Sequence, residues 1–218
     1  MSRTADPTAD AMPAAPGRLA AALRSTPVGM AVIVVALIVL FGVLSPNGAF
    51  FRVSNLSTIS LNVAVTMLLA VGITFVLAAG ELDLSIGSNV VLSAVIAAKV
   101  LVAVSGTPDE VRAGEYPDLA LGIVAGTIAA ILAGTLFGLV NGLLVTRLRI
   151  NSFIVTLGTM GIGTGLAYVV SNGVNVANVP RSLQTGFGIE KLFGIVPYPL
   201  IVVLIISAVL WYTPRRPR

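Results

Sequence analysis

Long apolar runs separated by shorter polar stretches dominate the chain. Each run is close to the roughly 20 residues that an α-helix needs to cross the hydrocarbon core of a bilayer. The runs cover residues 28–44, 59–79, 89–106, 119–145, 153–170 and 195–212. The pattern predicts an all-α, polytopic membrane protein with about six transmembrane helices.

The two ends of the chain fall outside this pattern. Residues 1–26 combine Ala, Pro and Asp with three arginines and cannot build a core, so we expect a disordered tail. Ser25 and Thr26 precede Pro27, an order typical of a helix start. Residues 214–218 form a basic end. The membrane domain is therefore expected to span residues 27–213.

The composition supports a membrane protein and excludes several chemistries. Of the 218 residues, 56% are hydrophobic and 10% are charged, whereas a soluble domain carries about 25% charged residues. The chain has no cysteine and no histidine, which excludes thiol chemistry, a histidine-based catalytic triad and the usual zinc sites. The sequence also lacks a phosphate-binding loop and a dinucleotide-binding glycine motif. We predict no enzyme activity, no metal and no cofactor.

The stretch 78–88 interrupts the apolar pattern. Glu81, Asp83 and Ser85 stand there between two apolar runs, with a glycine near either end. A charged group at bilayer depth costs about 3 kcal/mol on insertion scales, and irregular backbone is tolerated there only inside protein or beside water. The stretch predicts a broken-helix element at 80–88 beside a transport path. The alternative is an ordinary polar turn at the membrane surface, and re-entry into the membrane stays open.

The fourth and fifth apolar runs carry small and hydroxyl-bearing residues. A small residue at every fourth position lets a neighbouring helix approach closely. The predicted packing glycines of the fourth run are Gly122, Gly126, Gly134, Gly138 and Gly142. The fifth run is rich in glycine and threonine, so its helix is easily bent and its hydroxyls can hydrogen-bond within the bundle. It predicts either a solute-lining helix or a tightly packed helix without solute contact.

Basic residues indicate the orientation. Six crossings with the N-terminus inside put eight arginines in the cytoplasm: Arg3, Arg18, Arg24, Arg147, Arg149, Arg215, Arg216 and Arg218. Four basic residues then lie outside: Arg52, Arg112, Arg181 and Lys191. This bias favours a cytoplasmic N-terminus. The net charge of +4 does not indicate nucleic-acid binding, because the basic residues lie at segment ends and not on one face.

Four segments carry a family resemblance: 70–77 (AVGITFVL), 79–88 (AGELDLSIGS), 141–150 (NGLLVTRLRI) and 153–160 (FIVTLGTM). Together they resemble the membrane permeases of ribose-type, simple-sugar ABC importers, over about residues 50–213. The resemblance implies a multi-pass permease of the cell (inner) membrane for a sugar or similar small polar solute. It also implies a cytoplasmic ATP-binding subunit, an extracytoplasmic solute-binding protein and a second permease copy as partners, with membrane lipid around them.

We predict that the solute passes the 80–88 element and the fifth helix. The expected substrate-pathway residues are Glu81, Asp83, Ser85, Asn141, Thr156 and Thr159. Two alternatives stay open at this point. One is an ion-coupled secondary carrier that uses Glu81 and Asp83 as proton or cation sites. The other is a fragment that inserts and packs but transports nothing.

The C-terminal end differs from the family pattern. Permeases of this family continue past the positions of Trp211 and Thr213 into a cytoplasmic coupling segment and further spans. This chain reads PRRPR over residues 214–218 instead. We therefore expect the N-terminal part of a permease, shortened by truncation or frameshift, without the segment that contacts the ATPase.

Overall fold

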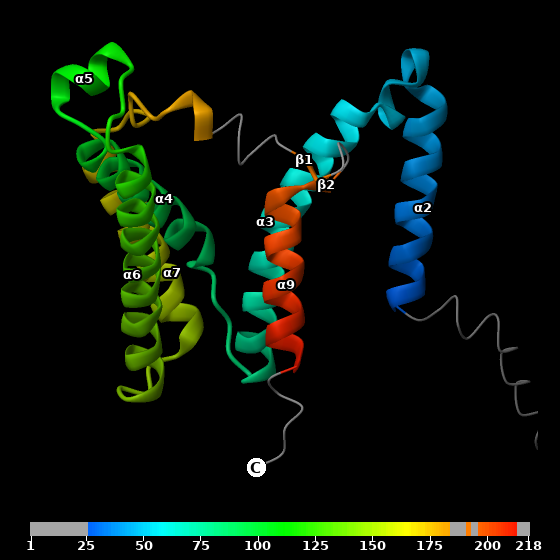
Figure 1. Ribbon diagram of the computed structural model, residues 1–218. Coiled ribbons are helices and arrows are strands. Elements are labelled where there is room, and N and C mark those ends of the chain that lie inside the picture. Colours follow the sequence, from blue (N-terminus) through cyan, green and yellow to red (C-terminus); the bar gives the residue numbers. More distant parts are fainter. Residues whose placement is uncertain (1–25, 184–190, 193–195, 213–218) are drawn as a thin grey trace, which may run out of the picture. The chain divides into compact units, whose positions relative to one another are not determined.

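The structure is a computed structural model that describes residues 26–183, 191–192 and 196–212 (Figure 1). The chain divides after Leu56 into two units. The predicted disordered tail and the basic end lie outside the described residues, apart from Thr26, the first residue of a helix. Nearly all of the described chain is helical, which confirms the predicted all-α membrane fold.

Five helices of the described chain are long and apolar enough to cross a membrane. They are α2 (Thr26–Leu44), α3 (Val53–Ala78), α4 (Ile86–Val104), α6 (Leu119–Thr146) and α7 (Ser152–Ser171). The sixth predicted span is the shorter helix α9 (Tyr198–Tyr212), which has 15 residues. It begins later than predicted because Val196–Pro197 (β2) pairs with Lys191–Leu192 (β1) as a two-residue antiparallel ladder. The starts of α3 and α4 also differ: these helices begin six and three residues before their apolar runs, at Val53 and Ile86, in stretches that the pattern assigned to connections.

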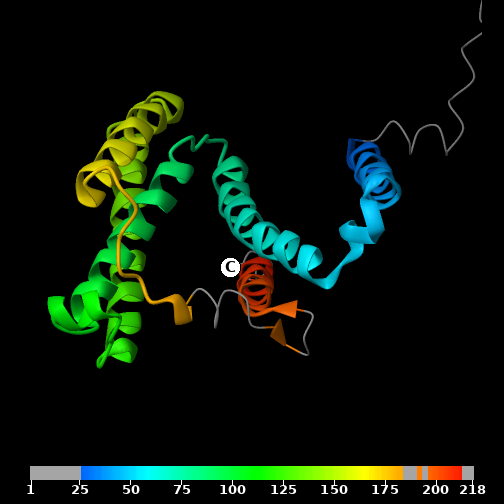
Figure 2. The same ribbon diagram turned by 90° about the horizontal axis from the view of Figure 1, so that it is seen from above.

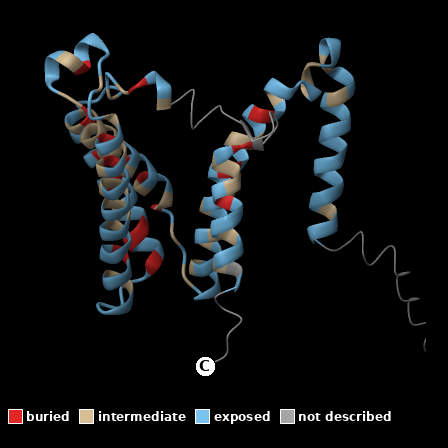
Figure 3. Ribbon diagram, in the orientation of Figure 1, coloured by how far each residue is buried: buried red, intermediate tan, exposed pale blue. Residues whose placement is uncertain are grey.

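The first unit contains α2 and a short 3₁₀ helix, η1 (Pro46–Phe51). No residue of α2 is buried (Figure 3). The contact between α2 and η1 is aromatic: the Phe41 and Phe50 rings stack with centroids 6.1 Å apart, and Phe51 meets Phe50 edge-on at 5.1 Å. Asn55 donates from Nδ2 to the Phe50 carbonyl at 2.8 Å, which ties the start of α3 to η1.

In the second unit α4, α6 and α7 pack together (Figures 1 and 2). Helices α4 and α6 are antiparallel. At one end the Asp118 amide donates to the Ser105 carbonyl at 3.0 Å, and farther along Asn89 donates from Nδ2 to the Gly134 carbonyl at 3.3 Å. Most large apolar side chains of α6 and α7 are exposed in the isolated chain, as expected of helices whose outer faces meet lipid or other protein.

The polar stretch 107–118, which separates the third and fourth apolar runs, contains a short helix, α5 (Pro108–Ala113), with a capping box. Glu110 Oε2 accepts hydrogen bonds from the Thr107 amide and the Thr107 hydroxyl, both at 2.7 Å. In return the Glu110 amide donates to the Thr107 hydroxyl oxygen at 3.4 Å. This reciprocal pair satisfies amides that the helix itself leaves unpaired. Gly114 ends the helix with a positive φ of 85°.

The capping box predicts a pH dependence of α5. The hydrogen bond from the Thr107 hydroxyl, followed by that from the Thr107 amide, lowers the pKa of Glu110 below its ordinary value of 4.5. Because the folded pKa is the lower one, the cap is complete above pH 4.5 and is lost as the pH falls through the lowered pKa. Thr107→Ala is expected to raise the pKa of Glu110, as read from the titration of a ¹³C-labelled carboxyl by NMR. Thr107→Ser, which keeps a hydroxyl, should titrate like the parent; equal pKa values in all three proteins would refute the assignment.

Candidate functional site

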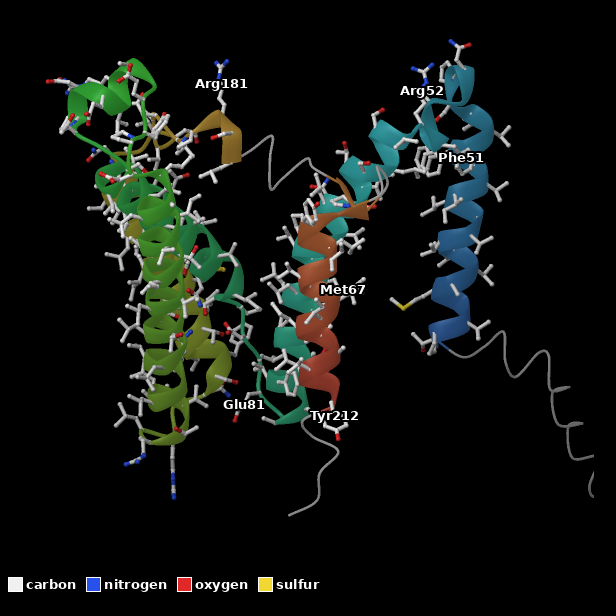
Figure 4. The ribbon with its side chains drawn as sticks, viewed as in Figure 1. Phe51, Arg52, Met67, Glu81, Arg181 and Tyr212 are labelled. Atoms are coloured by element: carbon white, nitrogen blue, oxygen red, sulfur yellow. The ribbon has the colours of Figure 1, made fainter. Side chains whose placement is uncertain are left out.

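The connection between α3 and α4 is irregular backbone over residues 79–85. Gly80 has a φ of +82°, a left-handed conformation that glycine adopts without strain. It reverses the chain after α3, and residues 81–83 continue without regular structure. Glu81 and Asp83 therefore stand on open backbone and not on a continuous helix, as the sequence predicted. Figure 4 labels Glu81 on this connection.

Asp83 organises the beginning of α4. Its Oδ1 accepts hydrogen bonds from the Ser85 amide at 2.8 Å and from the Ser85 hydroxyl at 2.6 Å. The carboxylate thus stands just before the positive end of a helix, where a negative group is stabilising. The Ser85 carbonyl in turn accepts from the Asn89 amide at 2.9 Å, the first regular hydrogen bond of α4.

Two hydrogen bonds and one longer contact hold the connection against α6 and α7. Asn141 of α6 donates from Nδ2 to the Ser85 hydroxyl oxygen at 2.7 Å. At the start of α7, the Ser152 hydroxyl oxygen accepts from the Leu82 amide at 3.2 Å, and the Thr156 hydroxyl lies 3.4 Å from the Leu82 carbonyl. The side chain of Asn141 is thereby linked through Ser85 to the carboxylate of Asp83.

A cavity of about 340 Å³ lies between this connection and the ends of α3, α6 and α7. Four predicted pathway residues line it: Glu81, Asp83, Asn141 and Thr156. The other two do not. Ser85 is 1% exposed, and its hydroxyl is hydrogen-bonded to Asp83. Thr159 lies about one turn farther along α7 than Thr156, and its hydroxyl donates to the Thr156 carbonyl. The remaining lining includes apolar residues of α3 and α6, such as Phe75 and Val145.

Two polar groups at this cavity have no hydrogen-bond partner among the described residues. Asn141 is 7% exposed, and its carbonyl oxygen Oδ1 is buried and unpaired. A buried unpaired acceptor costs about 1–3 kcal/mol, so a partner from outside the described residues would stabilise it. Glu81 is half-buried, and its carboxylate makes neither a hydrogen bond nor an ion pair with the described part of the chain.

The predicted glycine stripe of α6 divides into two parts. Added methyl groups at Gly122 and Gly126 would lie 2.9 and 2.8 Å from backbone carbonyls of α4, and one at Gly134 would lie 3.3 Å from the Ser93 hydroxyl. These three glycines therefore face α4. Gly138 and Gly142 have open space beside them and line the cavity, so the structure does not place them in a helix contact.

Three further residues position the site without having been predicted for it. Ser152 accepts the Leu82 amide, and Asn89 bridges α4 to α6. At Gly163 an added methyl group would lie 2.8 Å from the Ser88 hydroxyl and 2.9 Å from the Phe137 ring, so this glycine lets α4, α6 and α7 meet. The glycine-rich composition of the fifth run was the only available signal, and it does not distinguish Gly163 from its neighbours.

The fold and the cavity define a multi-pass helical membrane protein with a break between two of its spans, lined by carboxylate, amide and hydroxyl groups together with apolar side chains. The chain belongs to the family described as branched-chain amino acid transport system / permease component, whose model matches residues 55–217. Together with the sugar-permease relatives described next, this match to a family of transport permeases confirms the resemblance that the sequence suggested.

The curated relatives include sugar permeases. The chain is 31% identical over 186 residues to the D-allose transport system permease protein of Escherichia coli (strain K12), covering 85% of this chain and 52% of that protein. It is 39% identical over 144 residues to the L-arabinose ABC transporter permease protein of Azospirillum brasilense, covering 65% and 37%. It is 31% identical over 178 residues to the autoinducer 2 import system permease protein of Yersinia pseudotuberculosis serotype O:3 (strain YPIII), covering 82% and 45%.

The chain spans about half the length, or less, of these relatives. No solved structure matches the chain.

Proposed function

We propose that the chain is the membrane-spanning permease subunit of an ABC importer for a sugar or similar small polar solute. A separate ATP-binding subunit would supply the energy, and an extracytoplasmic binding protein would deliver the solute. The names of the sugar-transporting relatives support this assignment. The observation that carries it is the cavity, because it gathers carboxylate, amide and hydroxyl groups between helices that are otherwise apolar.

The orientation of the chain is part of this proposal. With the N-terminus in the cytoplasm, the short basic connection between α6 and α7 is cytoplasmic, as the bias of arginines favours. The cavity is lined by Thr146 at the end of α6 and by Ser152 at the start of α7. It would therefore open toward the cytoplasmic side, on the same side as the ATP-binding subunit.

In this mechanism the connection 79–85 is a movable wall of the solute path. Alternating access requires an element with two arrangements that a partner can favour differently. Among the described residues, the connection is held to α6 and α7 by two side-chain hydrogen bonds, from Asn141 and to Ser152, and by a longer contact with the Thr156 hydroxyl. A sugar hydroxyl or water can replace each of them at low cost. The wall can therefore separate from α6 and α7 without disturbing the α4–α6 contact.

The ion-coupled carrier is the less favoured function. Its proton or cation would bind at Glu81 and Asp83, but Oδ1 of Asp83 already accepts two hydrogen bonds that begin α4. Two of the relatives are named as an ABC transporter permease and an import system permease. We therefore propose that the carboxylates at the cavity contact the solute and do not bind a coupling ion.

The energy source distinguishes these functions. Deletion of the chromosomal gene is expected to abolish uptake of at least one of labelled D-allose or L-arabinose in cells that carry it. In the parent cells, arsenate, which depletes ATP, should stop this uptake. An uncoupler given to cells whose ATP is maintained should leave the initial rate unchanged. Uptake that survives arsenate but collapses with the uncoupler would overturn the proposal in favour of the ion-coupled carrier.

A further inference from the structure

The cavity beside the connection 79–85 is negatively charged at its wall. The charged residues that line it are Glu81 and Asp83, and the described lining contains no lysine or arginine. The nearest basic residues along the chain, Arg147 and Arg149, follow the end of α6 and are exposed, so water and salt screen them. Protein walls screen the two carboxylates less than bulk water does. A cation entering the cavity is therefore attracted, and an anion is repelled.

Two of the three hydroxyls of the lining, those of Thr146 and Thr156, share this polarity; the third, Ser152, accepts from the Leu82 amide. The Thr146 hydroxyl donates its proton to the Gly142 carbonyl at 2.6 Å, and the Thr156 hydroxyl donates to the Ser152 carbonyl at 2.7 Å. A hydroxyl has one proton, so these oxygens can act toward the cavity only as acceptors. Oδ2 of Asp83 and the carboxylate of Glu81 are likewise acceptors without a partner in the described chain.

Asn141 is an independent indication of a ligand. It lines the cavity, is 7% exposed and leaves Oδ1 buried without a partner among the described residues. Its Nδ2 is directed to the Ser85 hydroxyl oxygen, whose own proton goes to Asp83. Reversing the amide would leave Ser85 with one proton for two acceptors. The direction of this chain of hydrogen bonds therefore leaves the carbonyl of Asn141 as the group that needs a donor.

We propose that this cavity is a hydrogen-bond-accepting site that selects solutes by charge. It takes a neutral or amino-bearing polyol and repels anionic derivatives such as sugar phosphates and sugar acids. Glu81 is the specificity-determining residue, because its carboxylate is the one that the fold does not use. Asn141 supplies the buried acceptor. This inference deepens the proposed function and rests on it for the identity of the solute as a polyol. The volume of about 340 Å³ is within the range of about 300–1,000 Å³ usual for small-molecule sites.

The absence of cysteine from the chain allows a direct measurement of the cavity's charge. Val145, which lines the cavity, is replaced by cysteine as a reporter. The assembled transporter in membranes is treated with a cationic (ammonium) or an anionic (sulfonate) methanethiosulfonate. The rate of each reaction is followed by mass spectrometry, as the increase in mass of this chain on modification of the cysteine. Leu148→Cys, on a side chain that is 64% exposed, is the matched surface reporter.

The expected result is that the Val145→Cys reporter prefers the cationic reagent more strongly than the Leu148→Cys reporter does. Adding Glu81→Gln should lower that preference about tenfold, since one nearby charge is removed from a protein-lined space. Glu81→Asp should restore it, and neither change should alter the ratio at Leu148→Cys. An unreactive cavity reporter, or a ratio that does not respond to Glu81→Gln, would overturn the proposal.

The measurement needs no transported solute, so its outcome is separate from that of the proposed function. A charge-selective cavity in a protein that fails the arsenate test would refute the ABC importer and leave the cavity's selectivity intact. Sugar uptake driven by ATP, together with a cavity that does not discriminate between the two reagents, would refute only the selectivity.

Discussion

Gly126→Ala is expected to destabilise the packed helices, whereas Gly138→Ala is expected to stabilise them slightly. The new methyl group at Gly126 would lie 2.8 Å from the carbonyl oxygen of Ala97 and 3.1 Å from Cβ of Leu101. The first of these is a backbone atom in the middle of α4, so α4 and α6 must move apart. Overpacking of this kind costs about 1–3 kcal/mol, which exceeds the gain of about 1 kcal/mol from replacing glycine by alanine in a helix.

Gly138 is the matched control because it belongs to the same helix and the same stripe. Beyond its own stretch of α6, no atom of the described residues lies within 4 Å of the position that its methyl group would take, so only the helix-propensity gain remains. Thermal unfolding of the two purified variants in detergent, each against the parent, checks the prediction. Shifts of the same sign and size would show that Gly126 and Gly138 have equivalent surroundings and that α4 does not pack on this stripe.

The opposite signs expected for these two glycines show what a spacing pattern can predict. The period of four identifies one face of α6, and the apolar runs locate the helices to within a few residues. The glycine spacing of α6 does not reveal where its partner helix, α4, begins. Asn141 lies opposite Ser85, which directly precedes α4. Gly142 is therefore beyond the start of α4 and faces the cavity, although its spacing equals that of Gly122 and Gly126.

The polar side of the site was predictable in its residue types but not in its pairings. A carboxylate and a serine two positions apart on open backbone can form a local hydrogen bond, as Asp83 and Ser85 do. The contacts of Asn141 with Ser85 and of Ser152 with Leu82 join residues 56 and 70 positions apart. These contacts depend on the axial offset between packed helices, which decides which residues lie at the same level. Hydrophobic length and glycine spacing do not determine that offset, so Ser152 was not predicted as a site residue.

Asp83→Leu is expected to lower thermal stability strongly and to abolish uptake, whereas Asp83→Asn should retain most of the stability. Oδ1 of Asp83 is the acceptor for both the amide and the hydroxyl of Ser85, a residue that is 1% exposed. Leucine removes the acceptor and leaves two buried donors unpaired, each at a cost of about 1–3 kcal/mol. Asparagine keeps an oxygen in the same place and loses only the attraction of the charge to the helix end, about 0.3–1 kcal/mol.

Both changes are made in the chromosomal gene, so that sugar uptake and the amount of protein in the membrane can be measured in the same cells. The melting temperatures of the purified proteins in detergent then distinguish the contribution of the acceptor oxygen of Asp83 from that of its negative charge. Two results contradict the assignment in different ways. If the Asp83→Leu protein has the melting temperature of the parent, Asp83 does not hold the start of α4. If the Asp83→Asn protein melts at the temperature of the Asp83→Leu protein, the charge of Asp83, and not its acceptor oxygen, stabilises the connection. The expected order is the parent first, asparagine slightly below it and leucine far below, because a leucine side chain offers no acceptor to the two donors that Ser85 now directs to Asp83.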